Sequence, residues 1–318
     1  MRKQSGLSLI ELMIAITLGL VLMAGVMQVF LSSRVTFSTH QAMSRVQETG
    51  RLAMEFLSRD IRMAGFMGCA SRSPGAVFMD SAGDLGGFHK DFEKGIEGFT
   101  SPVAGLTTKA GTDVLVVRTA DALPLLTLGE NDANSLTLRV GNSAIQNNCS
   151  NGICTGHAVA ASDCIDTRIY KAGTLSVVNG TTLKVAGGTF PAGNFGAGAE
   201  LIPVKTYVYY VAPSTADATR SSLWQKVNTD SAIELLEGVE DLSLTYGREG
   251  ATDFVKASAV TDWSKVNSVN VEMLVASIDN NVLEEKQKFT FDGSEVTAAD
   301  RRLHQVFTST IAARSNAF

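Results

Sequence analysis

The chain has 318 residues, of which 45% are hydrophobic and 19% are charged. These proportions are typical of a globular protein and exclude a disordered or collagen-like chain. The net charge of −5 does not predict a nucleic-acid partner, because such binding needs basic residues that displace counterions from phosphates. The length exceeds that of an ordinary domain and predicts an anchor with one large head, or with a head in two lobes.

Residues 7–31 form an apolar segment near the N-terminus. As a helix rising about 1.5 Å per residue, this segment is long enough to cross a bilayer core of roughly 30 Å. Arg2 and Lys3 precede it, which predicts a cytoplasmic N-terminus and an exported head. The alternative is a cleaved secretory signal peptide, which has a shorter apolar core and a small-residue cleavage site. Neither feature is present, so we expect a retained transmembrane anchor.

Glu11 is the one charged residue of the apolar segment. A carboxylate in hydrocarbon costs about 2.5–3.5 kcal/mol, so it needs a partner or a proton. The alternative is a carboxylate that reaches the membrane interface or favours the positive end of the helix.

The basic leader, Gly6 and the following LSLIELMIAITLGL resemble the signal of type IV prepilins and type II secretion pseudopilins. The resemblance implies that a prepilin peptidase cleaves between Gly6 and Leu7, removes residues 1–6 and methylates the amine of Leu7. The usual first mature residue is phenylalanine, and Leu7 departs from it. Glu11 then matches the family's glutamate at the fifth mature position. We expect Glu11 to pair with the N-terminal amine of an adjacent pilin and so to set the subunit register, since either charge alone is costly in an apolar core.

A helical pattern continues beyond the apolar segment. Its apolar residues are spaced three or four apart, at Met43, Val46, Gly50, Ala53, Leu57 and Ile61. One spine helix is therefore expected over residues 7–62, with residues 7–31 in the membrane or filament core and residues 32–64 as its amphipathic second half. Glu55 and Arg59 are expected to form an ion pair on the exposed face. The alternative is two helices with a break near Ser32 and Ser33 or at Gly50.

Residues 65–318 are predicted to form a large, mainly antiparallel β head, which gives an α+β, pilin-like fold class. The predicted strands are residues 112–119, 135–140, 167–172, 175–178, 182–185, 205–211, 223–227, 239–246, 266–278, 288–291 and 303–312. A short helix is expected at residues 232–236. Residues 80–102 and 185–199 are rich in glycine and are predicted to be surface loops.

The four cysteines all follow the apolar segment, and none forms the C-x-x-C spacing of a zinc site. In an exported head, an even number of cysteines predicts disulfides. The preferred pairing joins Cys149 with Cys154 and Cys69 with Cys164. The other connectivities stay open, as does a pair of buried free thiols.

The sequence carries no motif for catalysis, a metal or a cofactor. None of the four histidines has metal-binding spacing, and the nucleophile elbow and the phosphate-binding loop are both absent. His157 lies near Cys154 and Cys164 in the sequence, and we expect it to be a loop residue. The same holds for the acidic cluster at residues 130–134, which lacks the later glutamate of a calcium loop. Tyr207 and Tyr209 are expected to pack on one strand face. We therefore expect a protein that is not an enzyme and has no cofactor.

Several segments outside the anchor resemble the PilW family of minor pilins, namely residues 48–69, 161–164, 235–247, 266–277 and 301–314. The resemblance implies a bacterial inner-membrane prepilin with a periplasmic head, which moves to the pilus tip and promotes pilus assembly, twitching, adhesion and DNA uptake. The implied partners are other minor pilins, the major pilin, the prepilin peptidase, the inner-membrane assembly platform and a large tip adhesin. The alternatives are a type II secretion pseudopilin of the J type and a membrane-tethered adhesin.

Overall fold

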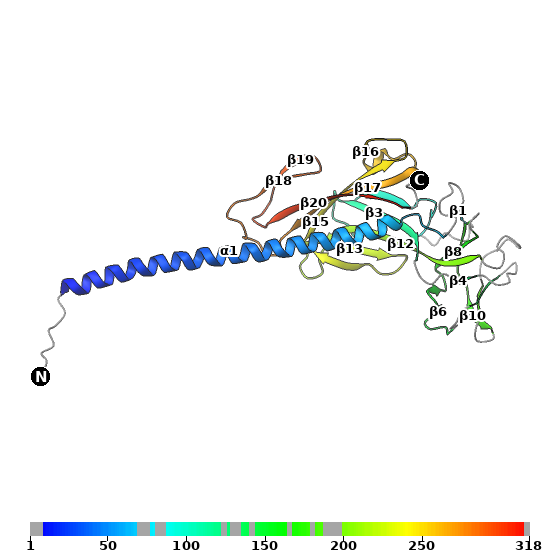
Figure 1. Ribbon diagram of the computed structural model, residues 1–318, viewed down its shortest axis with the longest axis horizontal. Coiled ribbons are helices and arrows are strands. Elements are labelled where there is room, and N and C mark those ends of the chain that lie inside the picture. The colour runs from blue at the N-terminus through cyan, green and yellow to red at the C-terminus, as the bar shows by residue number, and fades with distance from the viewer. Residues whose placement is uncertain are drawn as a thin grey trace.

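The computed structural model describes residues 9–68, 77–79, 87–121, 126–127, 135–139, 144–163, 167–178, 182–186 and 199–314. One long helix, α1 (Leu9–Met63), leads into a head of β-strands that packs on its second half (Figure 1). At about 1.5 Å per residue the 55 residues of α1 extend for roughly 80 Å. The predicted α+β, pilin-like fold is confirmed.

The spine helix is continuous through Ser32, Ser33 and Gly50, so the alternative of two helices is wrong. Its buried face consists of Ala42, Val46, Gly50, Ala53, Leu57, Asp60 and Ile61. The prediction of this face was wrong at Met43, which is 42% exposed, because the face begins one residue earlier at Ala42. The spacing of three and four residues is otherwise as expected for a helix with one face against a core.

Gly50 is required by close packing between the spine and the head. A β-carbon at this position would overlap the ring of Phe307, which belongs to strand β20 (His304–Ala312). The glycine therefore lets the helix approach the sheet closely.

The larger sheet has the order β1-β9-β8-β12-β13-β14, and β2, β3 and β4 pair beside that path. Its strands are β1 (Val77–Met79), β2 (Ile96–Thr100), β3 (Asp113–Ala120), β4 (Leu126–Thr127), β8 (Ala158–Ser162), β9 (Thr167–Lys171), β12 (Glu200–Pro213), β13 (Ser221–Val227) and β14 (Ile233–Glu237). All pairs are antiparallel except β1 with β9. The beginning of β12 pairs with β8, and its later part lies between β3 and β13.

A second, antiparallel sheet has the order β16-β15-β17-β20, and α1 packs across β17 and β20. Its other strands are β15 (Val239–Arg248), β16 (Phe254–Val255) and β17 (Val266–Ala276), and two short 3₁₀ helices, η2 (Ala257–Ala259) and η3 (Trp263–Lys265), lie between β16 and β17. The hairpin of β18 (Lys288–Phe291) and β19 (Ser294–Thr297) lies between β17 and β20 in the sequence. The main hydrophobic core joins the buried face of α1 to both sheets.

The end of the head farthest from the N-terminus contains a smaller sheet and a short hairpin (Figure 1). The sheet consists of β5 (Ser135–Arg139), β10 (Leu175–Val178) and β11 (Thr182–Ala186), and the hairpin of β6 (Cys149–Ser150) and β7 (Ile153–Cys154). This end has its own hydrophobic cluster, which includes Leu138, Tyr170, Leu183 and Leu201.

Most predicted strands are confirmed, with shifts of a few residues at their ends. The predicted helix at residues 232–236 is wrong, because Ile233–Glu237 pairs with β13 as strand β14. The predicted loop at residues 80–102 contains strand β2 in its described part. Most of the predicted loop at residues 185–199 lies outside the described residues.

The tyrosines of β12 pack in the interior, as predicted. Tyr209 is completely buried in the main core, and Tyr207 packs partly buried against the same core. Tyr210 points to the other side of the sheet, where it joins Val114, Val116 and Val208. The alternation of side chains along a strand therefore divides β12 between two clusters.

Changing Gly50 to alanine is expected to destabilise the protein by about 1 kcal/mol. Alanine stabilises an ordinary helix by about that amount relative to glycine, whereas overpacking costs about 1–3 kcal/mol. Urea denaturation measures the net effect. In a Phe307→Ala background the same change is expected to become stabilising, because the ring no longer occupies the space. A destabilisation of equal size in both backgrounds would contradict the packing argument.

Candidate assembly interface

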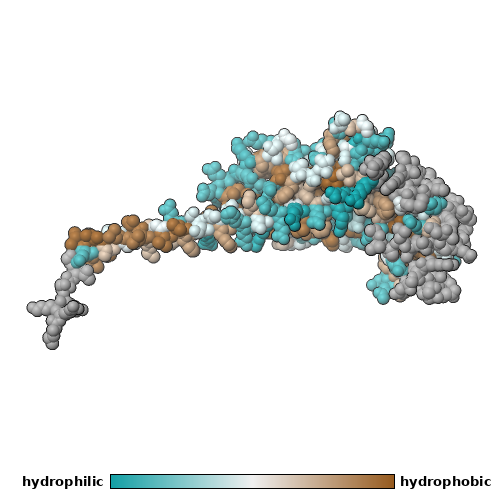
Figure 2. All heavy atoms as spheres, viewed as in Figure 1, coloured by the Kyte–Doolittle hydropathy of each residue, from teal (hydrophilic) through white to brown (hydrophobic). Residues whose placement is uncertain are grey.

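The first half of α1 projects from the head and exposes an apolar surface (Figures 1 and 2). Leu9, Leu20 and Phe30 are 77%, 64% and 62% exposed. Within the described residues, α1 is the one helix long and apolar enough to cross a membrane. Such a surface must be covered by lipid or by other apolar helices, because an uncovered patch of this size drives association in water.

Glu11 lies in the first turn of α1 among exposed apolar neighbours, including Leu9, Ile10 and Leu12. Its place at the start of the helix is the one that the sequence predicted. Arg2, Lys3, Gly6 and Leu7 lie outside the described residues, so cleavage after Gly6, methylation of Leu7 and the pairing of Glu11 stay predictions.

The segment between β17 and β18 contacts the middle of the spine. The Thr39 hydroxyl donates to the backbone carbonyl of Val282, with 3.3 Å between the oxygens. Nearby, Glu284 and the helix residues from Ala24 to Thr36 line an open cleft of about 710 Å³. The head therefore reaches along the spine to the level of Gln28 and Leu31.

A buried carboxylate joins the spine to the larger sheet. Asp60 is only 5% exposed, and its Oδ2 accepts a hydrogen bond from the Tyr209 hydroxyl at 2.5 Å. Gln225 Nε2 donates to the same hydroxyl oxygen at 2.6 Å. Burial, and then the neighbouring Asp60 carboxylate, raise the pKa of Tyr209 far above its ordinary value. The phenol therefore keeps its proton, which forms the hydrogen bond to Asp60.

Sequence reasoning missed this contact, although a signal was present. Asp60 follows Leu57 by three residues, which places an acid on the apolar face of a helix. The expected ion pair of Glu55 with Arg59 is also wrong, because Arg59 Nε donates to Asp60 Oδ1 at 3.0 Å. Arg59 thus supplies a positive charge to the carboxylate that attaches the spine to the head.

A second charged network joins three parts of the head. Glu240, in β15, accepts from Lys109 Nζ at 2.8 Å and from Arg302 Nη1 at 2.7 Å. The Ser221 hydroxyl also donates to Glu240, at 3.1 Å. Burial alone would raise the pKa of Glu240, but these hydrogen bonds and charges outweigh it and leave the pKa below its ordinary value of 4.5. Ionised Glu240 therefore stabilises the folded protein.

The stability contributed by Glu240 is expected to depend on pH. Its pKa is lower in the folded chain, so the contribution is complete above the unfolded value of about 4.5 and is lost as the pH falls through the folded pKa. At pH 7, Glu240→Gln is expected to lower the free energy of unfolding by about 1–2 kcal/mol. Denaturation at several pH values should show this difference shrinking below about pH 4.5.

Glu249→Gln is the matched control, because Glu249 is an exposed glutamate in the turn just after β15. It is expected to leave stability unchanged at each pH. A loss for Glu240→Gln that is the same at pH 7 and in acid would contradict the role of its charge.

Two of the four cysteines lie in the described part of the head. Cys149 and Cys154 form a disulfide across the β6–β7 hairpin, which confirms that predicted pair. Cys69 and Cys164 lie outside the described residues, so their pairing stays a prediction.

Burial, with the nearby charges of His157 and Arg118, lowers the pKa of His89 to about 4. His89 is therefore neutral at pH 7, and its Nδ1 lies 2.8 Å from the Thr206 hydroxyl.

His157 lies in the turn between β7 and β8, as expected of a loop residue. Among the residues that the structure describes, no group of three or more histidine, cysteine, aspartate or glutamate side chains could hold a metal ion. The acidic cluster at residues 130–134 lies outside that part of the chain.

A long helix with an exposed apolar half, a single acid near its start and a β head on its other half define the pilin-like class of proteins. Comparison with known families gives two matches. Residues 208–315 match PilW, described as Type IV Pilus-assembly protein W, and residues 1–27 match the Prokaryotic N-terminal methylation motif. No match was found among the curated proteins or among the solved structures.

The two matches support a type IV pilus minor pilin, and they agree with the resemblance to PilW minor pilins seen in the sequence. The PilW match begins within β12 and ends just after β20, so it covers the sheet on which the spine packs. The resembling segments at residues 235–247, 266–277 and 301–314 lie inside this match. Those at residues 48–69 and 161–164 lie outside it.

Proposed function

We propose that this chain is a minor pilin that joins other minor pilins and the major pilin to start assembly of a type IV pilus and then remains at its tip. The observation that carries the proposal is the exposed apolar half of α1, which has Glu11 in its first turn and continues unbroken into the half of the helix that packs on the head. A structural role in a filament accounts for an apolar surface that the head does not cover. This role requires no enzyme activity.

The chain first resides in the inner membrane with its head in the periplasm. The prepilin peptidase cleaves after Gly6 and methylates Leu7, and the match to the methylation motif supports this step. Glu284 lies beside Gln28 in the cleft at the middle of the spine. A charged head residue at that depth favours a membrane boundary near Met27. Residues 7–27 still extend for about 30 Å, enough to cross the bilayer core.

The tip position follows from the bulk of the head. Residues 65–318 on a single spine hinder repeated lateral stacking along a filament, whereas a subunit at the tip has few neighbours. Tip complexes with other minor pilins and a large adhesin, and roles in twitching, adhesion and DNA uptake, belong to this proposal. The match to PilW favours a pilus over a type II secretion pseudopilus.

Deletion of the gene tests the proposal. Cells without the protein are expected to lose most surface pili and to stop twitching, and a copy of the gene is expected to restore both. Electron microscopy of pili and a motility assay measure these outcomes. Normal pili with a defect in protein secretion would instead identify a pseudopilin. Normal pili with a loss of attachment alone would identify a membrane-tethered adhesin.

A further inference from the structure

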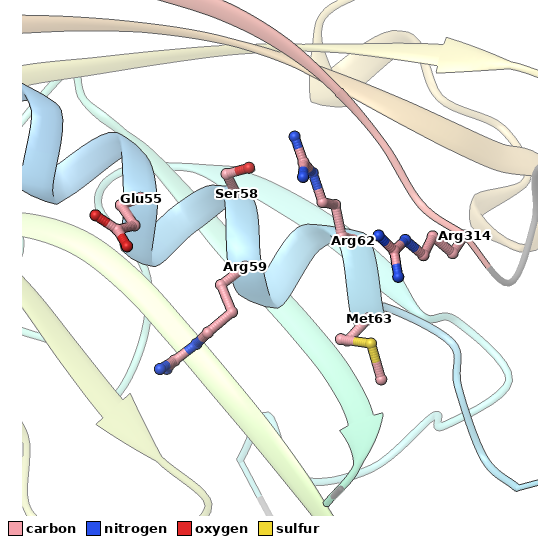
Figure 3. Close-up of a pocket in the computed structure, with 6 residues that line it drawn as sticks. All are labelled: Glu55, Ser58, Arg59, Arg62, Met63 and Arg314. Atoms are coloured by element: carbon pink, nitrogen blue, oxygen red, sulfur yellow. The ribbon is translucent and has the colours of Figure 1, made fainter.

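A cleft rich in arginine lies at the C-terminal end of the spine, where α1 meets the segment that follows β20 (Figure 3). Its volume is about 330 Å³, and its lining consists of Glu55, Ser58, Arg59, Arg62, Met63 and Arg314. The cleft thus presents three guanidinium groups and one carboxylate in a chain whose net charge is −5.

The positive charge of the cleft comes mainly from Arg62 and Arg314. The backbone N–H of Arg314 donates to the carbonyl of Arg62 at 3.0 Å, which holds the two residues together and satisfies a carbonyl at the helix end. Both side chains are exposed, and Figure 3 shows Arg62 projecting from the last turn of the helix while Arg314 reaches toward the helix end from the segment after β20. Arg59 differs, because it already binds Asp60. Among the described residues, no carboxylate lies within ion-pair distance of the Arg62 or Arg314 guanidinium.

Two guanidinium groups that line one cleft without a carboxylate at ion-pair distance make the cleft electropositive, so it attracts an anion. Arginine also has the donor geometry to hold a carboxylate through two parallel hydrogen bonds. The surroundings favour a protein partner over a small anion. Met63, whose side chain is partly exposed, also lines the cleft. Arginine and methionine are both enriched at protein interfaces.

We propose that this cleft docks a carboxylate-bearing segment of a neighbouring pilin, with Arg62 and Arg314 as the residues that bind it. The inference rests on the proposed function, because a neighbouring subunit reaches this side of α1 when the chain assembles through its spine. Opposite charges at such a contact select the correct neighbour and fix its orientation.

The first test reverses the charge of the cleft. A strain with Arg62→Glu and Arg314→Glu is expected to show a roughly tenfold fall in surface pili, because attraction across the contact becomes repulsion. Arg45→Glu with Arg51→Glu is the matched control, since both arginines are exposed on the same helix outside the cleft. The control is expected to keep native pilus numbers. Arg62→Gln with Arg314→Gln, which removes the charge without reversing it, is expected to give an intermediate loss.

The melting temperature of each purified full-length variant separates a lost contact from a lost fold. If gene deletion abolishes pili but the charge-reversed strain makes native numbers of them, this inference is overturned and the proposed function stays intact. Normal pili after gene deletion would overturn the proposed function itself.

The second test identifies the occupant of the cleft. A photoreactive amino acid replaces Ser58 in the native host, and mass spectrometry identifies the crosslinked peptide. A crosslink to an acidic segment of another pilin supports the proposal. Changing the carboxylates of that segment to lysine in the charge-reversed strain is then expected to restore pili. Crosslinks only to lipid, or only to proteins that are not pilins, would overturn it.

Discussion

Cells that carry the Glu11→Gln variant are expected to assemble roughly tenfold fewer pili than cells with the native protein. A carboxylate in an apolar core costs about 2.5–3.5 kcal/mol by insertion scales unless it is paired, and each tenfold change in an equilibrium corresponds to about 1.4 kcal/mol. Each processed subunit would bring both an ammonium at Leu7 and a carboxylate at Glu11 to the same depth. Glutamine keeps the size of the side chain but cannot pair with that ammonium. Counting surface pili by electron microscopy measures the effect.

Thr17→Val is the matched control for Glu11, since Thr17 is a neutral polar residue of the same apolar segment. Its hydroxyl donates to the carbonyl of Ile14 within the helix, so its loss is expected to leave pilus numbers unchanged. The amount of processed protein in the membrane must be equal in all strains. Wild-type numbers of pili with Glu11→Gln would refute the proposed charge pairing.

Changing Asp60 to alanine is expected to lower the free energy of unfolding by about 2–3 kcal/mol. The change removes the acceptor of the buried Tyr209 hydroxyl, and leaving such a group unsatisfied costs about 1–3 kcal/mol on top of the lost hydrogen bond. Urea denaturation of the full-length protein in detergent, followed by tryptophan fluorescence, measures the loss. Proteolysis between the spine and the head is expected to accelerate, because fewer contacts then hold them together.

Two further variants separate the hydrogen bond from other effects of the Asp60 change. Glu55→Ala removes an exposed carboxylate of the same helix and is expected to change stability by less than about 0.5 kcal/mol. Tyr209→Phe removes the donor, and the double variant completes a cycle whose coupling energy is expected to exceed about 1 kcal/mol. Additive effects of Asp60→Ala and Tyr209→Phe would mean that the two side chains do not stabilise the fold as a pair.

The spine was predictable because its signals are local and long. The first half of α1 is apolar on all sides and its second half repeats one apolar face from Ala42 to Ile61, so an error of one residue at Met43 does not alter the conclusion. The strands of the head were predictable for a similar reason, since β-branched residues alternate within each of them. The spine also carries Glu11, so the main candidate residue for assembly could be found without a structure.

The failures have a different cause, which is contact between distant parts of the chain. Residues 232–236 have a helical pattern, but the edge of β13 is available for pairing, and a bulge between Leu223 and Trp224 accommodates β14 there. Asp60 could be placed on the buried face by counting residues, but its partner Tyr209 lies 149 positions away. The arginine cleft likewise needs the fold, because α1 and Arg314 meet only after the whole head has formed.

If the protein sits at the tip of a pulled pilus, as proposed, the position of β12 has a mechanical consequence. This strand extends from the distal end of the head to the sheet beside the spine (Figure 1), and it is hydrogen-bonded to β3 and β13 along its later part. Tension applied at the distal end is therefore transmitted along β12. Because the bonds of an antiparallel ladder lie perpendicular to the strands, such tension shears many of them at once instead of opening them one by one. The head is thus built to resist force along this strand.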